Sequence, residues 1–223
     1  NTIAIINIDC DNVMDFKYSD HITIDYKIDL SNISNVNRDN YCGNCLRGTT
    51  YSPDGLYLLV AKMGGNGVAV IRTKDMEYIG TISGSKLNLR HLTIKNNFIY
   101  VSSNRYGFVQ RLPLSKLKEL SLIDSKNKIF NFDSWQSIKV GQGARTISLT
   151  PDGKYLFACI NNESKIVVVD TNSFKIIDTI KVNKFPVGLA ISPDGKYLIS
   201  TSQGKSGHAN TGNAVNVFKI IYS

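Results

Sequence analysis

The sequence Ile191-Ser192-Pro193-Asp194-Gly195-Lys196-Tyr197-Leu198-Ile199-Ser200 is repeated in the chain, with near-copies at residues 149–158 and 51–60. Each copy has an apolar run, a Ser/Thr-Pro-Asp-Gly turn and a second run that starts with Tyr-Leu. In such a turn proline fixes φ, the Asp side chain bonds the local backbone and Gly adopts a positive φ. The repeated unit is therefore predicted to be a β-hairpin.

The prolines of these turns set the period of the repeat. Pro151 and Pro193 are about 42 residues apart, and a little over twice that spacing separates Pro53 from Pro151. The longer gap holds a fourth copy at 92–101, in which Lys95-Asn96-Asn97 replaces the Pro-Asp-Gly turn. A period of this length is typical of propeller blades. We therefore predict an all-β fold, a β-propeller of four-stranded antiparallel blades.

All 223 residues are predicted to form one propeller domain, because propellers exceed the usual domain size without splitting. Residues 1–45 are predicted to be a partial or irregular blade, in which 1–7 and 13–18 have the layout of a third and a fourth strand. Successive blades follow at 46–88, 89–143, 144–183 and 184–223. Their innermost strands are predicted to contain Thr50, Ile94, Ser148 and Ala190.

Two segments depart from the regular pattern. An alternating run at 21–28 precedes a polar stretch that is typical of a long loop. Within the blade at 89–143, Leu114, Leu117 and Leu120 indicate a short helix.

Charge and composition narrow the function. The net charge is +8, but the lysines are scattered and no segment combines a basic stripe with exposed aromatic residues, so we predict no nucleic-acid partner. No apolar run approaches the roughly 20 residues of a membrane span, and no signal sequence is present in this chain.

The four cysteines, Cys10, Cys42, Cys45 and Cys159, do not form a metal or haem motif. Leu46 stands where haem attachment to the Cys42–Cys45 pair would need a histidine, and a zinc site would need a second pair. We predict no cofactor and no metal. A local disulfide and free thiols both remain open for Cys42 and Cys45.

The repeat resembles the YVTN-type β-propeller repeat family, a surface-layer-like and lactonase-like propeller family. Residues 186–198, Pro-Val-Gly-Leu-Ala-Ile-Ser-Pro-Asp-Gly-Lys-Tyr-Leu, follow its pattern closely, whereas the Tyr-Val-Thr-Asn stretch is degenerate, as in Tyr100-Val101-Ser102-Ser103. The resemblance implies seven blades and export to the bacterial periplasm or cell surface. Seven blades would leave only about 32 residues each, so we expect about five blades, as a closed ring or as the C-terminal part of a larger propeller.

Arginine recurs at the start of the innermost strand. Arg47, Arg90 and Arg145 occupy this position in three successive blades, and Val187 occupies it in the fourth. In a propeller this position and the loops between second and third strands lie on one face around the axis. Arginine binds carboxylate, sulfate or phosphate through paired N–H donors, so we predict an axial site for an anionic ligand. The loops are predicted to add Lys62, Arg105, Asn161, Gln203 and His208.

The chain is thus predicted to be a non-enzymatic, exported binding or scaffold propeller. Its partner would be an acidic glycan, a phosphorylated compound, or a protein on the axial face. The arginines could instead be hydrated, or bonded to loop carbonyls of the neighbouring blade. A lactonase-like hydrolase is the alternative function, with Glu163 or His208 as the only candidate general bases.

Overall fold

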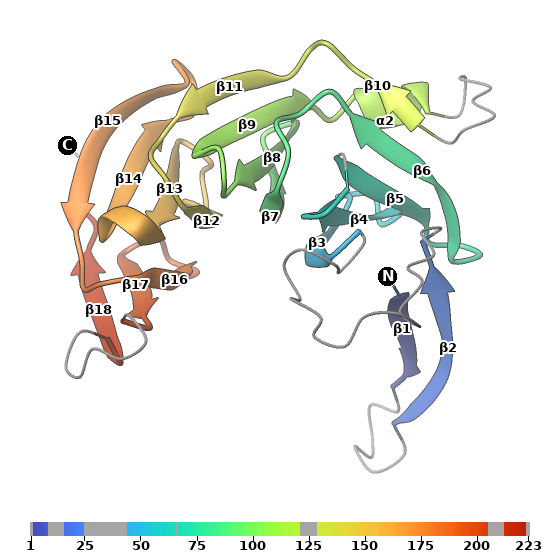
Figure 1. Cartoon of the computed structure of the whole chain (residues 1–223), viewed down its shortest axis with the longest axis horizontal. Helices are drawn as coiled ribbons and strands as arrows, with labels where there is room; N and C mark the ends of the chain where they lie inside the picture. The colour runs from blue at the N-terminus through green and yellow to red at the C-terminus, as the bar shows by residue number, and fades with distance from the viewer. Residues whose placement is uncertain are drawn as a thin grey trace, which may run out of the picture.

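The computed structural model describes residues 2–8, 16–24, 44–65, 67–120, 129–204 and 212–221. These residues form five β-sheets that follow one another around an open arc (Figure 1). The strands β3, β7, β12 and β16 lie along the inner side of the arc, and β6, β11 and β15 run along its outside. This is the arrangement of propeller blades, as predicted.

The sheets follow the order of the chain. The first sheet pairs β1 (Thr2–Asn7) with β2 (Lys17–Thr23). The second contains β3 (Leu46–Tyr51), β4 (Tyr57–Lys62), β5 (Val68–Arg72) and β6 (Glu77–Ser83). The third contains β7 (Leu89–Lys95), β8 (Phe98–Ser103), β9 (Phe108–Pro113) and β11 (Gln136–Lys139). The fourth contains β12 (Ala144–Leu149), β13 (Tyr155–Ile160), β14 (Lys165–Asp170) and β15 (Lys175–Lys181). The fifth contains β16 (Pro186–Ile191), β17 (Tyr197–Ser202) and β18 (Ala214–Lys219).

Thr50, Ile94, Ser148 and Ala190 lie on innermost strands, as predicted. The fourth strand of the first unit differs, because β2 starts at Lys17 rather than at residue 13, and 13–15 lie outside the described residues. The reason is burial, since Ile22, within β2, packs against the second sheet, whereas Tyr18 is exposed. Among the described residues, the fifth sheet has three strands rather than four.

The third unit contains an insertion that reaches the second sheet. The predicted short helix is α2 (Lys116–Glu119), in which Leu117 is buried. After it, β10 (Ile129–Asn131) pairs parallel with β6, so the second sheet gains a fifth strand from the next repeat. All other strand pairs are antiparallel.

The repeated turns have the predicted chemistry. Gly55, Gly153 and Gly195 have φ values of 71°, 72° and 74°. In the third of these turns, Ser192 Oγ donates to Asp194 Oδ1 at 2.6 Å and accepts from the backbone N–H of Tyr197 at 2.9 Å. The positive φ at glycine and the Ser–Asp bond hold the reversal between an innermost and a second strand.

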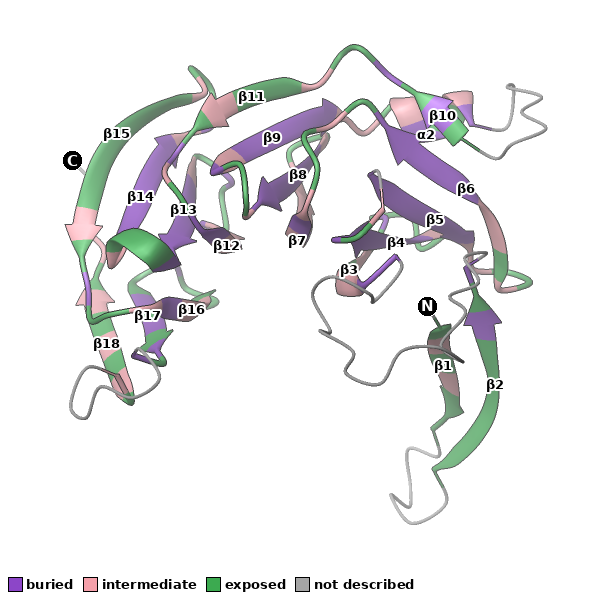
Figure 2. Ribbon diagram, in the orientation of Figure 1, coloured by how far each residue is buried: buried purple, intermediate pink, exposed green. Residues whose placement is uncertain are grey.

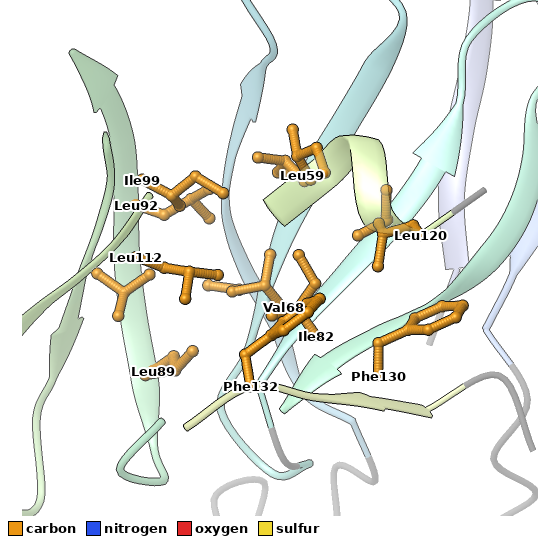
Figure 3. Packing of buried hydrophobic residues seen from close by; sticks show 14 residues of the cluster. Leu59, Val68, Ile82, Leu89, Leu92, Ile99, Leu112, Leu120, Phe130 and Phe132 are labelled. Carbon is orange, nitrogen blue, oxygen red and sulfur yellow. The ribbon is translucent and has the colours of Figure 1, made fainter. Parts of the chain in front are cut away.

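Apolar side chains fill the spaces between adjacent sheets. Figure 3 shows the cluster between the second and third sheets, with Leu59 and Val68 on one side and Leu92 and Ile99 on the other. The middle strands of the second, third and fourth sheets are buried on both faces (Figure 2). Stability therefore comes from sheet-on-sheet burial, at about 25 cal/mol per Å² of apolar surface.

The fifth sheet leaves its outward face uncovered. Val215 and Val217 are 65% and 60% exposed, whereas Ile166 and Val168, at the same register in β14, are 0% and 6% exposed because the fifth sheet covers them. In the described part of the chain, no helix combines the length and apolar character needed to cross a bilayer.

Candidate functional site

Each innermost strand of the four later sheets has a β-bulge near its start. The bulged segments contain Arg47 in β3, Arg90 in β7, Arg145 in β12 and Val187 in β16. A bulge takes an extra residue out of the ladder and redirects its side chain, and bulges are frequent beside binding sites. The predicted ligand positions therefore coincide with a repeated backbone irregularity that the turn motif does not require.

The bulged ends of neighbouring inner strands contact one another. Ser102 Oγ donates to the carbonyl of Arg145, and Thr146 Oγ1 donates to the carbonyl of Val187. A side chain on Gly48 would place its Cβ 3.2 Å from the Cα of His91, so β3 and β7 approach closely at the same level. The three arginines thus lie at equivalent places on adjacent strands.

The arginine side chains are half-buried. The Nη2 of Arg47 lies 3.6 Å from the Sδ of Met63, at the end of the second strand. The Arg145 guanidinium acts electrostatically on the thiol of Cys159, in the neighbouring strand β13. These contacts place both arginines at the end of the sheets where the innermost strands begin.

Two predicted cations have other surroundings. Lys62 was predicted in a loop of the anion site, but it is the last residue of β4, it is buried, and its Nζ donates to Thr81 Oγ1 of β6 at 3.1 Å. Burial lowers the pKa of Lys62. Arg105 is exposed, and its backbone N–H donates to Asn88 Oδ1 at 3.1 Å. Lys62 therefore belongs to the interior of the second sheet, and Arg105 is the one of the two that stays accessible.

Asn161 and Gln203 lie at the same end as the bulges. The Asn161 N–H donates to the carbonyl of Gly143, just before β12, and the Gln203 N–H donates to the carbonyl of Phe185, just before β16; both distances are 3.0 Å. His208 lies outside the described residues.

A cleft of about 350 Å³ lies between the fourth and fifth sheets at this end. It is lined by Asn161, Asn162, Ser164, Lys184 and Phe185. Sequence reasoning missed Lys184 and Phe185, because they lie in the connection between two blades rather than in a loop between second and third strands. The sequence could have indicated these two residues, because they directly precede Pro186, the first residue of an innermost strand.

Glu163, the described candidate for a general base, is already paired. Its Oε2 lies 2.6 Å from Lys165 Nζ, and its Oε1 accepts the backbone N–H of Gln142 at 2.6 Å. The hydrogen bond from Lys165 holds the pKa of Glu163 below its usual range. A carboxylate stabilised in this way is a poor proton acceptor near neutral pH. The ion pair could have been predicted from the sequence, because Glu163 and Lys165 are only two residues apart.

The cysteines are structural in the described part of the chain. Cys45 is in a disulfide bond, and Cys10 and Cys42 lie outside the described residues. Cys159 is a buried free thiol, and burial raises its pKa to about 12, so it is not a nucleophile. No group of three His, Cys, Asp or Glu among the described residues could hold a metal ion.

Solved structures similar to this chain are β-propellers. A "putative 6-phosphogluconolactonase" from Bacteroides fragilis has 20% identity and a TM-score of 0.69 over 98% of this chain and 60% of that one. One from Bacteroides uniformis has 17% identity and a TM-score of 0.68 over 98% and 60%. The β-propeller domain of Cps50 (Swd1) from Myceliophteria thermophila has 12% identity and a TM-score of 0.58 over 79% and 54%.

This chain thus spans about 60% of the length of the two Bacteroides structures. At such identities the likeness establishes the fold alone, and the predicted β-propeller is confirmed. No family model and no curated protein matches the sequence, so the narrower YVTN-type resemblance stays a prediction.

Proposed function

We propose that this chain is a binding propeller that holds an anionic ligand at the bulged ends of its innermost strands. The ligand class is an acidic glycan or a phosphorylated compound, or an acidic segment of a protein partner. The observation that carries this proposal is the recurrence of Arg47, Arg90 and Arg145 at a β-bulge in three adjacent inner strands. Neither the turn motif nor the packed core requires arginine there.

The chemistry of the three residues supports an anion. A guanidinium offers its N–H groups in a planar fork that matches a carboxylate or phosphate. Three such groups at equivalent places on adjacent inner strands, in a chain with a net charge of +8, favour a negatively charged ligand.

A lactonase-like hydrolase is the second candidate, carried by the likeness to the two Bacteroides structures described as lactonases. Lactone hydrolysis needs a group that activates water. Glu163 is engaged by Lys165 and Gln142, which favours binding over hydrolysis in the part of the chain that the structure describes.

The test is the affinity of the chain for 6-phosphogluconate, measured by calorimetry. Replacing any one of Arg47, Arg90 and Arg145 by Ala should weaken binding by about 1.5–3 kcal/mol, the range for hydrogen bonds to charged groups. Val187→Arg adds an arginine at the equivalent position of the fifth sheet, and this variant should bind 6-phosphogluconate more tightly. Replacing the exposed Arg105 by Ala should reduce this affinity less than replacing Arg47, Arg90 or Arg145.

Equal affinities of the parent and the triple alanine variant would overturn the proposal. Hydrolysis is scored in parallel with 6-phosphogluconolactone as substrate. Turnover above the spontaneous rate, lost in the triple variant, would favour the lactonase over the binding protein.

We also propose export to an oxidising compartment, the bacterial periplasm or the cell surface. The disulfide bond of Cys45 supports this location, because disulfides persist in oxidising compartments and are rare in the cytosol.

A further inference from the structure

The cleft between the fourth and fifth sheets has its own polar groups, apart from the arginines. One wall is the 3-10 turn that follows β13, with Asn161, Asn162 and Ser164. The other wall is the connection before β16, with Lys184 and Phe185. Both walls belong to the end of the sheets where the bulges lie.

The connection that carries Lys184 and Phe185 is held in place by the fifth sheet. The Gln203 N–H donates to the Phe185 carbonyl, and the Gly204 N–H donates to the Lys184 carbonyl, both at 3.0 Å. Phe185 has a φ of 58°, an unfavourable conformation for a bulky residue that these two bonds maintain. The two side chains are thus presented by a fixed backbone, which lowers the cost of ordering them around a ligand.

Asn161 supplies a buried polar group with no partner. The residue is 5% exposed, and its Oδ1 is sealed from solvent without a hydrogen bond. This oxygen lies against Gly143, where a Cβ would be only 1.9 Å away. With the oxygen turned to the Gly143 backbone, the amide N–H₂ is the part of Asn161 that can donate to a ligand.

The charge of the cleft is positive. Lys184 is exposed, and no carboxylate of the described residues pairs with it. None of the described residues that line the cleft is acidic, and Glu163, next to Asn162 in the chain, is engaged by Lys165. Among the described residues, the lining therefore offers the ammonium group of Lys184, amide and hydroxyl groups, and the ring of Phe185.

We propose that this cleft binds an acidic monosaccharide, a hexuronate or a sugar acid of similar size. Lys184 receives the carboxylate, Asn161 and Asn162 bond the hydroxyl groups, and the ring of Phe185 covers an apolar C–H face of the sugar. The ammonium group of Lys184 suits a carboxylate, and a bare inorganic anion would leave the aromatic wall and the amides unused. This site is additional to the arginine site, and it does not depend on that site.

The test uses the 223-residue chain and D-glucuronate, with D-glucose as the neutral analogue. Glucuronate should bind with a measurable heat. The affinity for glucose should be at least about tenfold lower, because glucose lacks the charged hydrogen bond. Lys184→Gln should weaken glucuronate binding by a similar factor. The matched control is Lys181→Gln, an exposed lysine on β15 that does not line the cleft.

Two further variants separate the sugar from a simple anion. Phe185→Leu, whose folding is checked by its melting curve, should weaken glucuronate and leave inorganic phosphate unaffected. The variant in which Arg47, Arg90 and Arg145 are all Ala should keep its affinity for glucuronate, even if it loses 6-phosphogluconate. Equal losses in Lys184→Gln and Lys181→Gln would overturn the proposal. So would phosphate affinity equal to that of glucuronate, or loss of glucuronate binding in the arginine variant alone.

Discussion

The guanidinium of Arg111 lies between the third and fourth sheets. It is stacked between the rings of Phe98 and Phe174, at 4.5 and 4.3 Å from their centroids. Its Nε donates to Gln136 Oε1 at 2.7 Å, and its Nη1 donates to the carbonyl of Thr171. A buried charge is tolerated when its donors are satisfied; here Gln136 and the Thr171 carbonyl accept hydrogen bonds, and the two aromatic faces stabilise the charge by cation–π contact.

We therefore expect Arg111→Met, which keeps an apolar chain in the same space, to lower the free energy of unfolding by about 3 kcal/mol. Urea denaturation measures the loss. Arg105→Met, at an exposed arginine, is the control and should stay within about 0.5 kcal/mol of the parent. An Arg111→Met variant as stable as the parent would mean that the cost of burying the guanidinium cancels its contacts.

At the scale of the element, the hairpin turns differ in what surrounds them. The turn at Gly55 is open, since a Cβ there would meet nothing within 4 Å. The turn at Gly153 touches the preceding blade, because a Cβ would lie 2.3 Å from the Asn96 amide, which donates to the Asp152 carbonyl at 3.2 Å. The same motif thus has two roles, a free turn in one blade and a contact between blades in another.

This difference predicts unequal costs for one substitution. Gly55→Ala should cost about 1 kcal/mol, the strain of a positive φ. Gly153→Ala should cost about 1 kcal/mol more, because Asn96 has to give up its hydrogen bond. In an Asn96→Gly background, which keeps the positive φ of that turn possible, the extra cost should vanish. Melting curves of the four variants test the coupling, and an unchanged difference in that background would contradict it.

The strands and the arginine positions were predictable because they depend on local chemistry. The Pro-Asp-Gly turns and the apolar runs beside them predict the hairpins of the second, fourth and fifth sheets, and the repeat places Arg47, Arg90 and Arg145 at the start of three inner strands. The parallel pairing of β10 was not predictable, because three residues carry no period. Lys62 was predicted in a loop but ends β4, and its burial against Thr81 depends on a side-chain contact between β4 and β6 that the repeat does not reveal.

At the scale of the whole molecule, the arc ends in apolar surface. Tyr197, Ile199, Val215 and Val217 share the uncovered face of the fifth sheet, and each is at least 39% exposed. Apolar patches of this kind promote association. We expect the 223-residue chain to self-associate as its concentration rises, which sedimentation velocity can measure.

Lysine at both Val215 and Val217 should reduce this association, because charges on that face oppose its burial. Two lysines elsewhere, at the exposed Asn172 and Thr179, are the charge-matched control and should leave the association unchanged. Equal effects of the two pairs would attribute the change to net charge rather than to the face of the fifth sheet.

The insertion of the third unit links the second and third sheets. β10 pairs with β6 of the second sheet, β11 pairs with β9 of the third, and only residues 132–135 separate them. Trp135 Nε1 adds a hydrogen bond to the carbonyl of Ser83 at 3.0 Å. Repeat proteins can lose their units one at a time, because each unit contacts only its neighbours. Here the second and third sheets cannot part at their outer edge unless one of these pairings breaks. We therefore expect these two sheets to unfold together, and the opening of the arc to begin at its two ends.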